Sequence, residues 1–206
     1  MSTGLPLRVA VQLDPTTDDG ARTAPRRAAE MDCLGPARGS VVLDLMCGVG
    51  QYARLLPPRT RYLGVDHDPE MIQVARGRLR AGHGAVVGDA ARVPLRSGSA
   101  DHVLLTYEGL NSFRRAEQRH RVLGEVSRCL RPGGTALVDL WRPFEHPGPD
   151  ADRTHVTPRE LAVAAEAVGL KVTGCERLHA GATSDKAETR ASGQFLLRRT
   201  PRRRGR

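Results

Sequence analysis

The chain of 206 residues is poor in aromatic residues and almost free of lysine. Aromatic residues make up 3% of it, and lysine occurs only at positions 171 and 186. It has no aromatic-rich basic strand of the kind that stacks single-stranded bases. No apolar run approaches the ~20 residues that span a bilayer, and the N-terminus lacks the charged and apolar regions of a secretory signal. We therefore expect a cytoplasmic protein that does not cross a membrane.

Cysteine is scarce as well, with four residues, at positions 33, 47, 129 and 175, and no C-x-x-C pair. This spacing argues against a zinc site and against a disulfide framework, and we expect no metal. Cys47 lies in a glycine-containing turn, where a small buried thiol is the expected role rather than a nucleophile.

The net charge of +9 is concentrated at the C-terminus. Residues 198–206 contain six arginines and no acid, which leaves +3 for residues 1–197. Such a run can touch phosphates electrostatically, but it is more often a solvated tail. The composition therefore favours one domain without a nucleic-acid partner, followed by a basic tail over residues 200–206. Nothing in the sequence specifies an oligomeric state.

The most informative segment is residues 41–50, VVLDLMCGVG. Residues 41–45 have no polar face, as is typical of a strand covered on both sides in a parallel sheet. Gly48 and Gly50 then allow the backbone to approach a ligand closely. A helix is expected from Gln51, with its free N–H groups facing the same crevice. Strand, turn and helix together predict half of a nucleotide site, with Asp44 at its edge.

Further acids follow at the places where such a site needs them. Asp66 ends a second short strand, 22 positions after Asp44, close to the ~20-residue spacing at which a carboxylate reaches ribose hydroxyls. Asp89 follows a third strand in the same way. Residues 130–134, LRPGG, predict a helix end and a turn before a strand over residues 135–140.

On these motifs the chain resembles the class I S-adenosylmethionine-dependent methyltransferases over residues 25–199. The resemblance implies an α/β Rossmann-like, doubly wound fold, with a mostly parallel seven-stranded sheet, a terminal antiparallel strand and helices on both faces. It places the domain at residues 23–199, after a flexible segment at residues 1–22. One position departs from the family pattern: Met46 stands where the family most often has its first glycine, so its side chain must point away from the cofactor.

The resemblance also implies the cofactor, S-adenosyl-L-methionine, and its product, S-adenosyl-L-homocysteine. The residues expected to bind it are Asp44, Met46, Cys47, Gly48, Gly50, Asp66, His67, Asp89, Ala90, Thr106 and Tyr107. Residues 48–53 also fit the G-x-G-x-x-A pattern of dinucleotide sites, but that fingerprint requires neither Asp44 nor Asp89. A carboxylate at Asp44 suits an ammonium and a sulfonium better than a pyrophosphate.

The acceptor is expected above the carboxyl ends of the strands, in the loops at residues 107–113 and 141–146. Aromatic walls with a few polar groups suit a small organic acceptor. The predicted acceptor pocket consists of Tyr107, Asn111, Phe113, Trp141 and Phe144. Weak candidates for a general base are Glu108, His146 and His155. The alternatives are an RNA or protein methyltransferase, or a non-methylating enzyme on the same cofactor-binding fold.

The remaining pattern predicts the other elements. A helix capped by Thr23 should begin near Pro25 and stop at residues 35–36. Three further helices are expected after Asp68, over residues 115–130 and after Thr157. The segment between residues 89 and 100 is too short for a full helix. Two final strands are expected, over residues 171–178 and 194–199.

Overall fold

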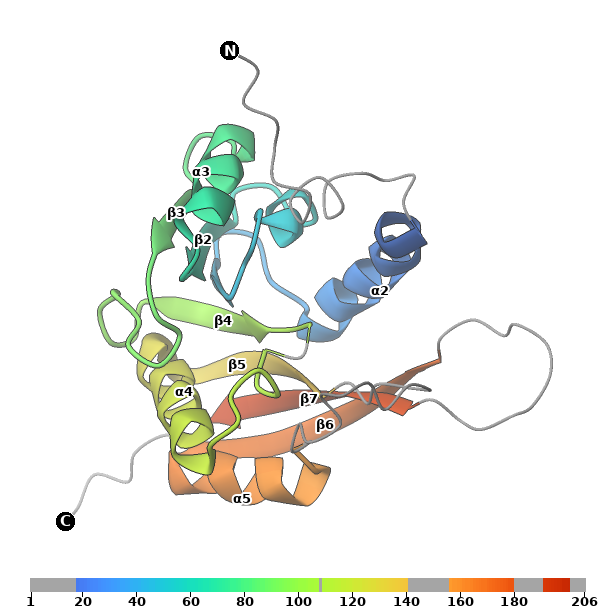
Figure 1. Ribbon diagram of the computed structural model, residues 1–206, viewed down its shortest axis with the longest axis vertical. Helices are drawn as coiled ribbons and strands as arrows, with labels where there is room; N and C mark the ends of the chain where they lie inside the picture. The colour runs from blue at the N-terminus through green and yellow to red at the C-terminus, as the bar shows by residue number, and fades with distance from the viewer. Residues whose placement is uncertain (1–17, 108, 141–155, 180–190, 201–206) are drawn as a thin grey trace.

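The structure, a computed structural model, describes residues 18–107, 109–140, 156–179 and 191–200 (Figure 1). The helices are α2 (Asp18–Leu34), the 3-10 turn η1 (Gln51–Arg54), α3 (Pro69–Arg78), α4 (Ala116–Cys129) and α5 (Pro158–Ala167). The strands are β1 (Val41–Leu45), β2 (Arg61–Asp66), β3 (Gly84–Val87), β4 (Ala100–Leu105), β5 (Leu130–Leu140), β6 (Leu170–His179) and β7 (Ala191–Arg199).

The strands form one seven-stranded sheet in the order β3-β2-β1-β4-β5-β7-β6. β7 is antiparallel to both of its neighbours, β5 and β6, and the other neighbouring strands pair in parallel. This arrangement confirms the predicted fold class. Strand order reverses between β1 and β4, and the crevice at the carboxyl ends of two such strands is where open α/β sheets bind ligands.

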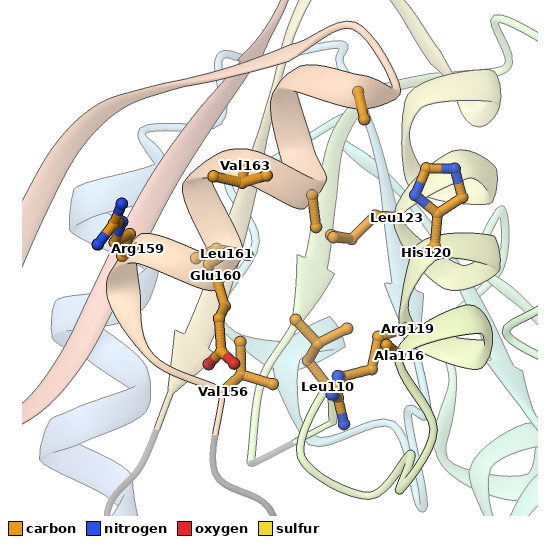
Figure 2. A pocket seen from close by; sticks show the side chains of 12 residues that line it. Leu110, Ala116, Arg119, His120, Leu123, Val156, Arg159, Glu160, Leu161 and Val163 are labelled. Carbon is orange, nitrogen blue, oxygen red and sulfur yellow. The ribbon is translucent and has the colours of Figure 1, made fainter.

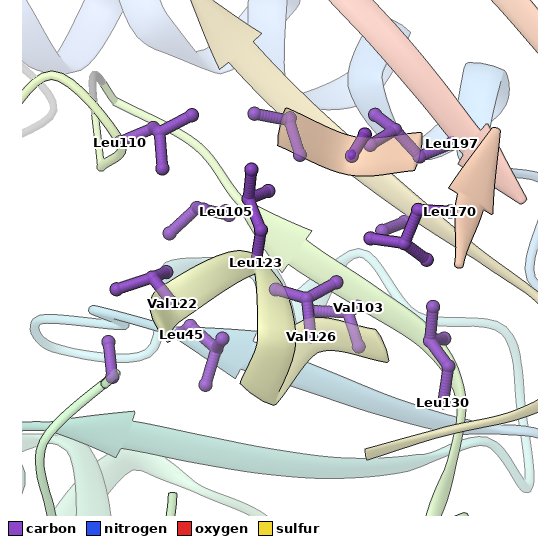
Figure 3. Packing of buried hydrophobic residues seen from close by; sticks show 14 of the residues in the cluster. Leu45, Val103, Leu105, Leu110, Val122, Leu123, Val126, Leu130, Leu170 and Leu197 are labelled. Atoms are coloured by element: carbon purple, nitrogen blue, oxygen red, sulfur yellow. The ribbon is translucent and has the colours of Figure 1, made fainter. Parts of the chain in front are cut away.

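The two faces of the sheet carry different clusters because side chains alternate along each strand. Leu43 and Leu45 of β1 belong to the cluster under α4 and α5, part of which Figure 3 shows. Val42 belongs to the opposite cluster, with Met31 of α2 and Ile72 of α3. Helices therefore cover both faces, and the face under α2 and α3 also carries the acids discussed below.

Two of the expected helices differ from the prediction. α2 begins at Asp18 and contains Pro25 in its interior, so the predicted start at Pro25, capped by Thr23, is wrong. Proline removes one backbone donor and kinks a helix, but it does not always end one. After Gly50 the chain makes only one 3-10 turn. Pro57 and Pro58 follow within a few residues, and proline disfavours helical backbone in the residue before it.

The strand after α4 also begins earlier than predicted. β5 starts at Leu130, and its register with β4 shifts between Ala100 and His102, so that residues 131–134 bulge out of the ladder. Gly133 has a φ of 81° in this bulge, a conformation that glycine adopts at no steric cost. The predicted turn is therefore present as an irregularity within the strand.

The other local predictions hold. Asp68 caps α3 through Oδ1, which accepts from the N–H of Glu70 at 2.9 Å. Thr157 and Glu160 form the expected capping box of α5. No α-helix lies between β3 and β4. None of the helices in the described part of the chain is long and apolar enough to span a membrane.

Candidate active site

A row of buried polar side chains crosses the carboxyl edge of the sheet. It runs through five adjacent strands, on the face that packs against α2 and α3. Its members are Asp66 at the end of β2, Asp44 in β1, Thr106 just after β4, Asp139 in β5 and Gln194 in β7. Each of these residues is at most 7% exposed. Buried polar groups need partners, and the row divides into two halves according to which partners they have.

The first half surrounds the glycine turn after β1. The N–H of Gly48 donates to Oδ2 of Asp66 at 2.8 Å, and the N–H of Asp68 donates to Oδ1 at 3.0 Å. These two bonds fix the carboxylate of Asp66 while leaving further lone pairs for a ligand. The ring of His67, Nδ1 of which lies 3.4 Å from Oδ1 of Asp66, is 82% exposed. The predicted ribose acid is therefore positioned by the backbone of the turn itself.

The turn uses a left-handed conformation at three of its residues. Met46 has a φ of 61°, Gly48 of 52° and Gly50 of 73°. A side chain costs roughly 1–2 kcal/mol in this region, which explains why glycine suits the position that Met46 occupies. The side chain of Met46 packs against the cluster under α4 and α5. It therefore points away from the row of acids, as the sequence predicted.

Asp44 is almost fully buried, and its Oδ2 accepts from the hydroxyl of Tyr62 at 2.6 Å. Burial raises the pKa of Asp44 to about 7, the bond from Tyr62 opposes this, and the nearby carboxylates of Asp66 and Glu30 add to it. Burial also raises the pKa of the Cys47 thiol. A neutral thiol is a poor nucleophile, so the structure agrees with the expected passive role of Cys47.

The second half of the row is bound by α2. The side chain of Glu30 is fully buried, accepts from Gln194 Nε2 at 2.7 Å and from Arg26 Nε at 3.0 Å, and is also hydrogen-bonded by the hydroxyl of Tyr52. Arg26 reaches on to the carboxylate of Asp139. One guanidinium thus joins two buried carboxylates, one on the helix and one on the sheet, and fixes α2 over the ends of β5 and β7.

Tyr107 lies between the two halves. Its backbone is left-handed, with a φ of 52°, and its ring meets the edge of Tyr52 at a centroid distance of 6.4 Å. The guanidinium carbon of Arg26 is 5.4 Å from the ring centroid, and Arg27 donates to the hydroxyl at 2.7 Å. The residue is nevertheless 43% exposed. It is an ordered aromatic surface beside the row.

The other predicted residues lie in several places. Asp89 is exposed, and its Oδ1 accepts from the N–H of Ala91 at 2.8 Å, while Ala90 is buried. Asn111 is buried, and its Oδ1 accepts from the N–H of Val156 at 3.2 Å. Phe113 is half-buried against the cluster under α4 and α5. Glu108, Trp141, Phe144, His146 and His155 lie outside the described residues.

A separate cavity of about 400 Å³ lies between α4 and α5 (Figure 2). Leu110, Leu123, Leu161 and Val163 supply much of its apolar lining, with Arg119 among the polar residues. None of the predicted cofactor or acceptor residues lines it. In the described part of the chain, no group of three or more His, Cys, Asp or Glu could hold a metal ion.

Sequence reasoning missed five residues of the site: Arg26, Glu30, Tyr62, Asp139 and Gln194. Two signals were present. Residues 136–140, ALVDL, repeat the pattern of residues 41–45, VVLDL, with an acid at the second-last position of an apolar strand. Tyr62 alternates with Gly64 and Asp66, which places all three on one face of β2. The partnership of Glu30 with Gln194, 164 positions away, has no local signal.

Comparison with known proteins agrees with this geometry. Residues 42–134 match the model of a family described as "Methyltransferase domain". This range contains the glycine turn, Asp44, Asp66 and Asp89, and ends at the bulge in β5. Over residues 42–134, slightly less than half of the chain, the sequence is that of a methyltransferase domain.

Curated methyltransferases resemble the chain mainly over its cofactor half. It is 38% identical over 104 residues to the mouse tRNA (carboxymethyluridine(34)-5-O)-methyltransferase, which is 50% of this chain but 15% of that protein. It is 36% identical over 106 residues to the demethylmenaquinone methyltransferase of Thermotoga maritima, 50% of this chain and 44% of that protein. It is 32% identical over 145 residues to the demethylmenaquinone methyltransferase of Beutenbergia cavernae, a stretch that covers 68% of this chain and 58% of that protein. The chain thus spans less than two thirds of each of these relatives.

Solved structures share the fold over most of the chain. A methyltransferase in complex with a Haloferax volcanii methyltransferase activator superposes with a TM-score of 0.68 at 23% identity, covering 89% of this chain and 97% of that one. A methyltransferase from Aquifex aeolicus superposes with a TM-score of 0.67 at 14% identity, and the match covers 91% of this chain and 100% of that one. At these identities the likeness shows the fold of the methyltransferase family.

Family and fold imply S-adenosylmethionine as the cofactor. The residues present fit it: an ordered carboxylate at the end of β2, a left-handed glycine turn and a second buried carboxylate in β1. Asp66 has the remaining acceptor capacity that ribose hydroxyls require. Asp44 lies beside a turn in which Gly48 and Gly50 carry no side chain, and its ionised carboxylate would suit a cationic amino-acid end.

Proposed function

We propose that the protein transfers a methyl group from S-adenosylmethionine to a small organic acceptor. The observation that carries the proposal is the divided polar row. One half, Asp66 and Asp44 with the glycine turn, presents acceptors to a cofactor. The other half is covered by α2. Tyr107, between them, offers an aromatic surface for the acceptor.

The residues of the chain contribute mainly by positioning. The bound sulfonium supplies an activated methyl group, so an acceptor atom must be held close and in line with it. Asp66 would hold the ribose, Asp44 the amino-acid end, and Tyr107 would flank the transfer position. Glu108, His146 and His155 remain the proposed proton acceptors for a nucleophile that must lose a proton.

A small acceptor is supported by α2 and its clamp. Arg26 fixes this helix over the ends of β5 and β7 through Glu30 and Asp139, which restricts access from that side. Enclosed sites lined by aromatic and a few polar groups are typical of small ligands. The resemblance to tRNA methyltransferases favours an RNA acceptor as the second candidate.

Calorimetry with S-adenosylhomocysteine tests the cofactor part. We expect binding by the parent and a loss of ~10-fold or more in Asp66→Asn, because a hydrogen bond to a charged group contributes about 1.5–3 kcal/mol. Asp32→Asn is the matched control, since it neutralises an exposed acid of α2 that is not among the expected cofactor residues. Unchanged affinity in Asp66→Asn, or tight binding of a nicotinamide dinucleotide by the parent, would refute the assignment.

Methyl-transfer assays test the acceptor part. Labelled S-adenosylmethionine is offered with a panel of small phenols, amines, thiols and quinols, and separately with bulk tRNA. We expect labelling in the small-molecule panel. Transfer to tRNA with none to the panel would establish the second candidate, and cofactor binding without transfer to either would support a non-methylating role.

A further inference from the structure

Gly64 has no side chain, and the space above its backbone lets Tyr62 reach the glycine turn after β1, where Asp44 and Asp66 also lie. Tyr62, Gly64 and Asp66 alternate on the same face of the strand, and Gly64 lies directly beside Asp44 in the β1–β2 register. A Cβ on Gly64 would stand 2.7 Å from Sγ of Cys47 and 3.1 Å from Cε1 of Tyr62. The tyrosine ring and the thiol therefore lie over the backbone of Gly64, and the ring can reach the neighbouring strand.

The position of the Tyr62 ring is fixed from several sides. The side chain is fully buried, and the N–H of Tyr62 donates to Nδ1 of His83 at 2.8 Å. The imidazole of His83 also meets the ring edge-on, at a centroid distance of 6.1 Å. At its other end the hydroxyl would lie 3.6 Å from a Cβ placed on Gly50. The hydroxyl is thus held beneath the glycine turn, with one oxygen of Asp44 as its acceptor.

The other charged and titratable groups facing Asp44 do not favour its ionised form. Asp66 at the end of β2 and Glu30 of α2 are carboxylates, and both raise its pKa, after burial as the main cause. Cys47 in the turn has a thiol whose pKa is itself raised by burial. No cation of the described residues forms an ion pair with Asp44. Among these neighbours Tyr62 alone lowers the pKa of Asp44.

We propose that Tyr62 is a positioning residue for the cofactor: its hydroxyl orients Asp44 beneath the glycine turn and stabilises the anionic form that receives the cofactor's ammonium group. This inference rests on the proposed function. Tyr62 acts on the cofactor only through Asp44, and its contribution is greatest near neutral pH. There the burial of Asp44 and the hydrogen bond from Tyr62 oppose each other in setting its charge.

The test is the pH dependence of S-adenosylhomocysteine binding, measured by calorimetry between pH 5.5 and 8.5. Asp44 must be ionised to bind an ammonium group, so parental affinity should rise with pH and level off above its pKa of about 7. Tyr62→Phe removes the bond that favours the anion. The midpoint of its binding curve should move to higher pH by about one unit, so that its affinity at pH 7 should fall roughly 5-fold.

Tyr52→Phe is the matched control, because it also removes a buried phenol hydroxyl, but one that bonds Glu30 rather than Asp44. Its midpoint should stay near the parental value. Asp44→Asn keeps an acceptor for Tyr62 but cannot ionise, so its weak binding should not vary with pH over this range. It provides the test if Tyr62→Phe fails to fold.

The outcomes separate the two proposals. If the parent does not bind S-adenosylhomocysteine at any pH, the proposed function is wrong. If the parent binds but Tyr62→Phe has the parental midpoint and affinity, Tyr62 is not a positioning residue while the proposed function stands. A parental midpoint that survives in Asp44→Asn would likewise overturn the inference, because another group would then be titrating.

Discussion

Asp44 and Asp139 occupy equivalent places in two strands but have opposite electrostatic surroundings. Each is the second-last residue of a strand, β1 or β5, and each is at most 2% exposed. Asp139 is paired with the guanidinium of Arg26, whereas the hydroxyl of Tyr62 is the hydrogen-bond donor to Asp44. Asp139 is thus paired with a cation of the protein itself, whereas we propose that Asp44 interacts with the cationic end of a ligand.

The first prediction is that Asp44→Asn stabilises the ligand-free protein at pH 8. The pKa of Asp44 in the folded protein, about 7, lies above the ordinary value of 3.8 for an aspartate. Between these values the folded state binds more protons than the unfolded state, so the contribution of Asp44 to stability falls as pH rises through this window. One pKa unit corresponds to about 1.4 kcal/mol. We therefore expect the free energy of unfolding of Asp44→Asn at pH 8 to exceed that of the parent by at least about 1 kcal/mol.

Thermal unfolding at pH 4 and pH 8 measures this effect. The difference between Asp44→Asn and the parent should be large at pH 8 and small at pH 4, where Asp44 is protonated in the folded state. The variant should bind S-adenosylhomocysteine weakly at pH 8. A variant less stable than the parent at pH 8 would show that Asp44 is not destabilising as an anion.

The second prediction concerns Arg26. Arg26→Met leaves Glu30 and Asp139 as buried carboxylates without their shared cation, and removing one partner of a buried pair costs about 3–5 kcal/mol. We expect a melting temperature lower by roughly 6–20 °C, at about 2–4 °C per kcal/mol for a chain of this size. Amide exchange in α2 should increase more than in α4.

A control variant and a rescue variant test whether the lost stability comes from the buried charges. Arg27→Ala should cost less than about 1 kcal/mol, because that side chain bonds the hydroxyl of Tyr107 at the surface and exposed polar contacts contribute little. Adding Glu30→Gln and Asp139→Asn to Arg26→Met should restore much of the lost stability, since the buried charges are then absent. Arg26→Met with parental stability would argue against the clamp.

The third prediction is that Met46→Gly retains cofactor binding and folding. Glycine removes the cost of the left-handed conformation at position 46, roughly 1–2 kcal/mol, but loses the packing of the methionine side chain. The melting temperature should therefore stay within a few degrees of the parent. Met46→Val should be less stable by at least about 1 kcal/mol, because β-branched residues tolerate this conformation poorly. Equal stability of Val and Met would count against strain at this turn.

The fourth prediction separates the candidate acceptors with the C-terminal tail. Arg198 and Arg199 belong to β7 and pair with its neighbouring strands, so a cut after Leu197 would remove strand residues. Truncation after Thr200 removes four arginines and no described residue. Turnover of a small acceptor should persist within a few fold. An RNA enzyme that docks through the tail would lose affinity and show a shallower salt dependence.

The sequence alone determined the framework of the cofactor half. The strand and turn of residues 41–50, and the positions of Asp66 and Asp89 at or after strand ends, were predicted correctly because these signals are local. An apolar run indicates a strand covered on both faces, and glycines occur where the backbone turns left-handed. Capping residues such as Asp68 and Thr157 fixed helix starts for the same reason. The proline at position 25 misled because its effect depends on what the rest of α2 packs against.

Only the tertiary structure decided which polar residues meet. Glu30 is joined to Gln194 and, through Arg26, to Asp139, contacts between segments far apart in the chain. Tyr62 reaches Asp44 because strand register sets Gly64 beside it. Hydrophobic periodicity shows which residues are buried, but the partner of a buried polar group depends on strand order and register. These are set by the packing of the whole sheet, and the electrostatic difference between Asp44 and Asp139 follows from them.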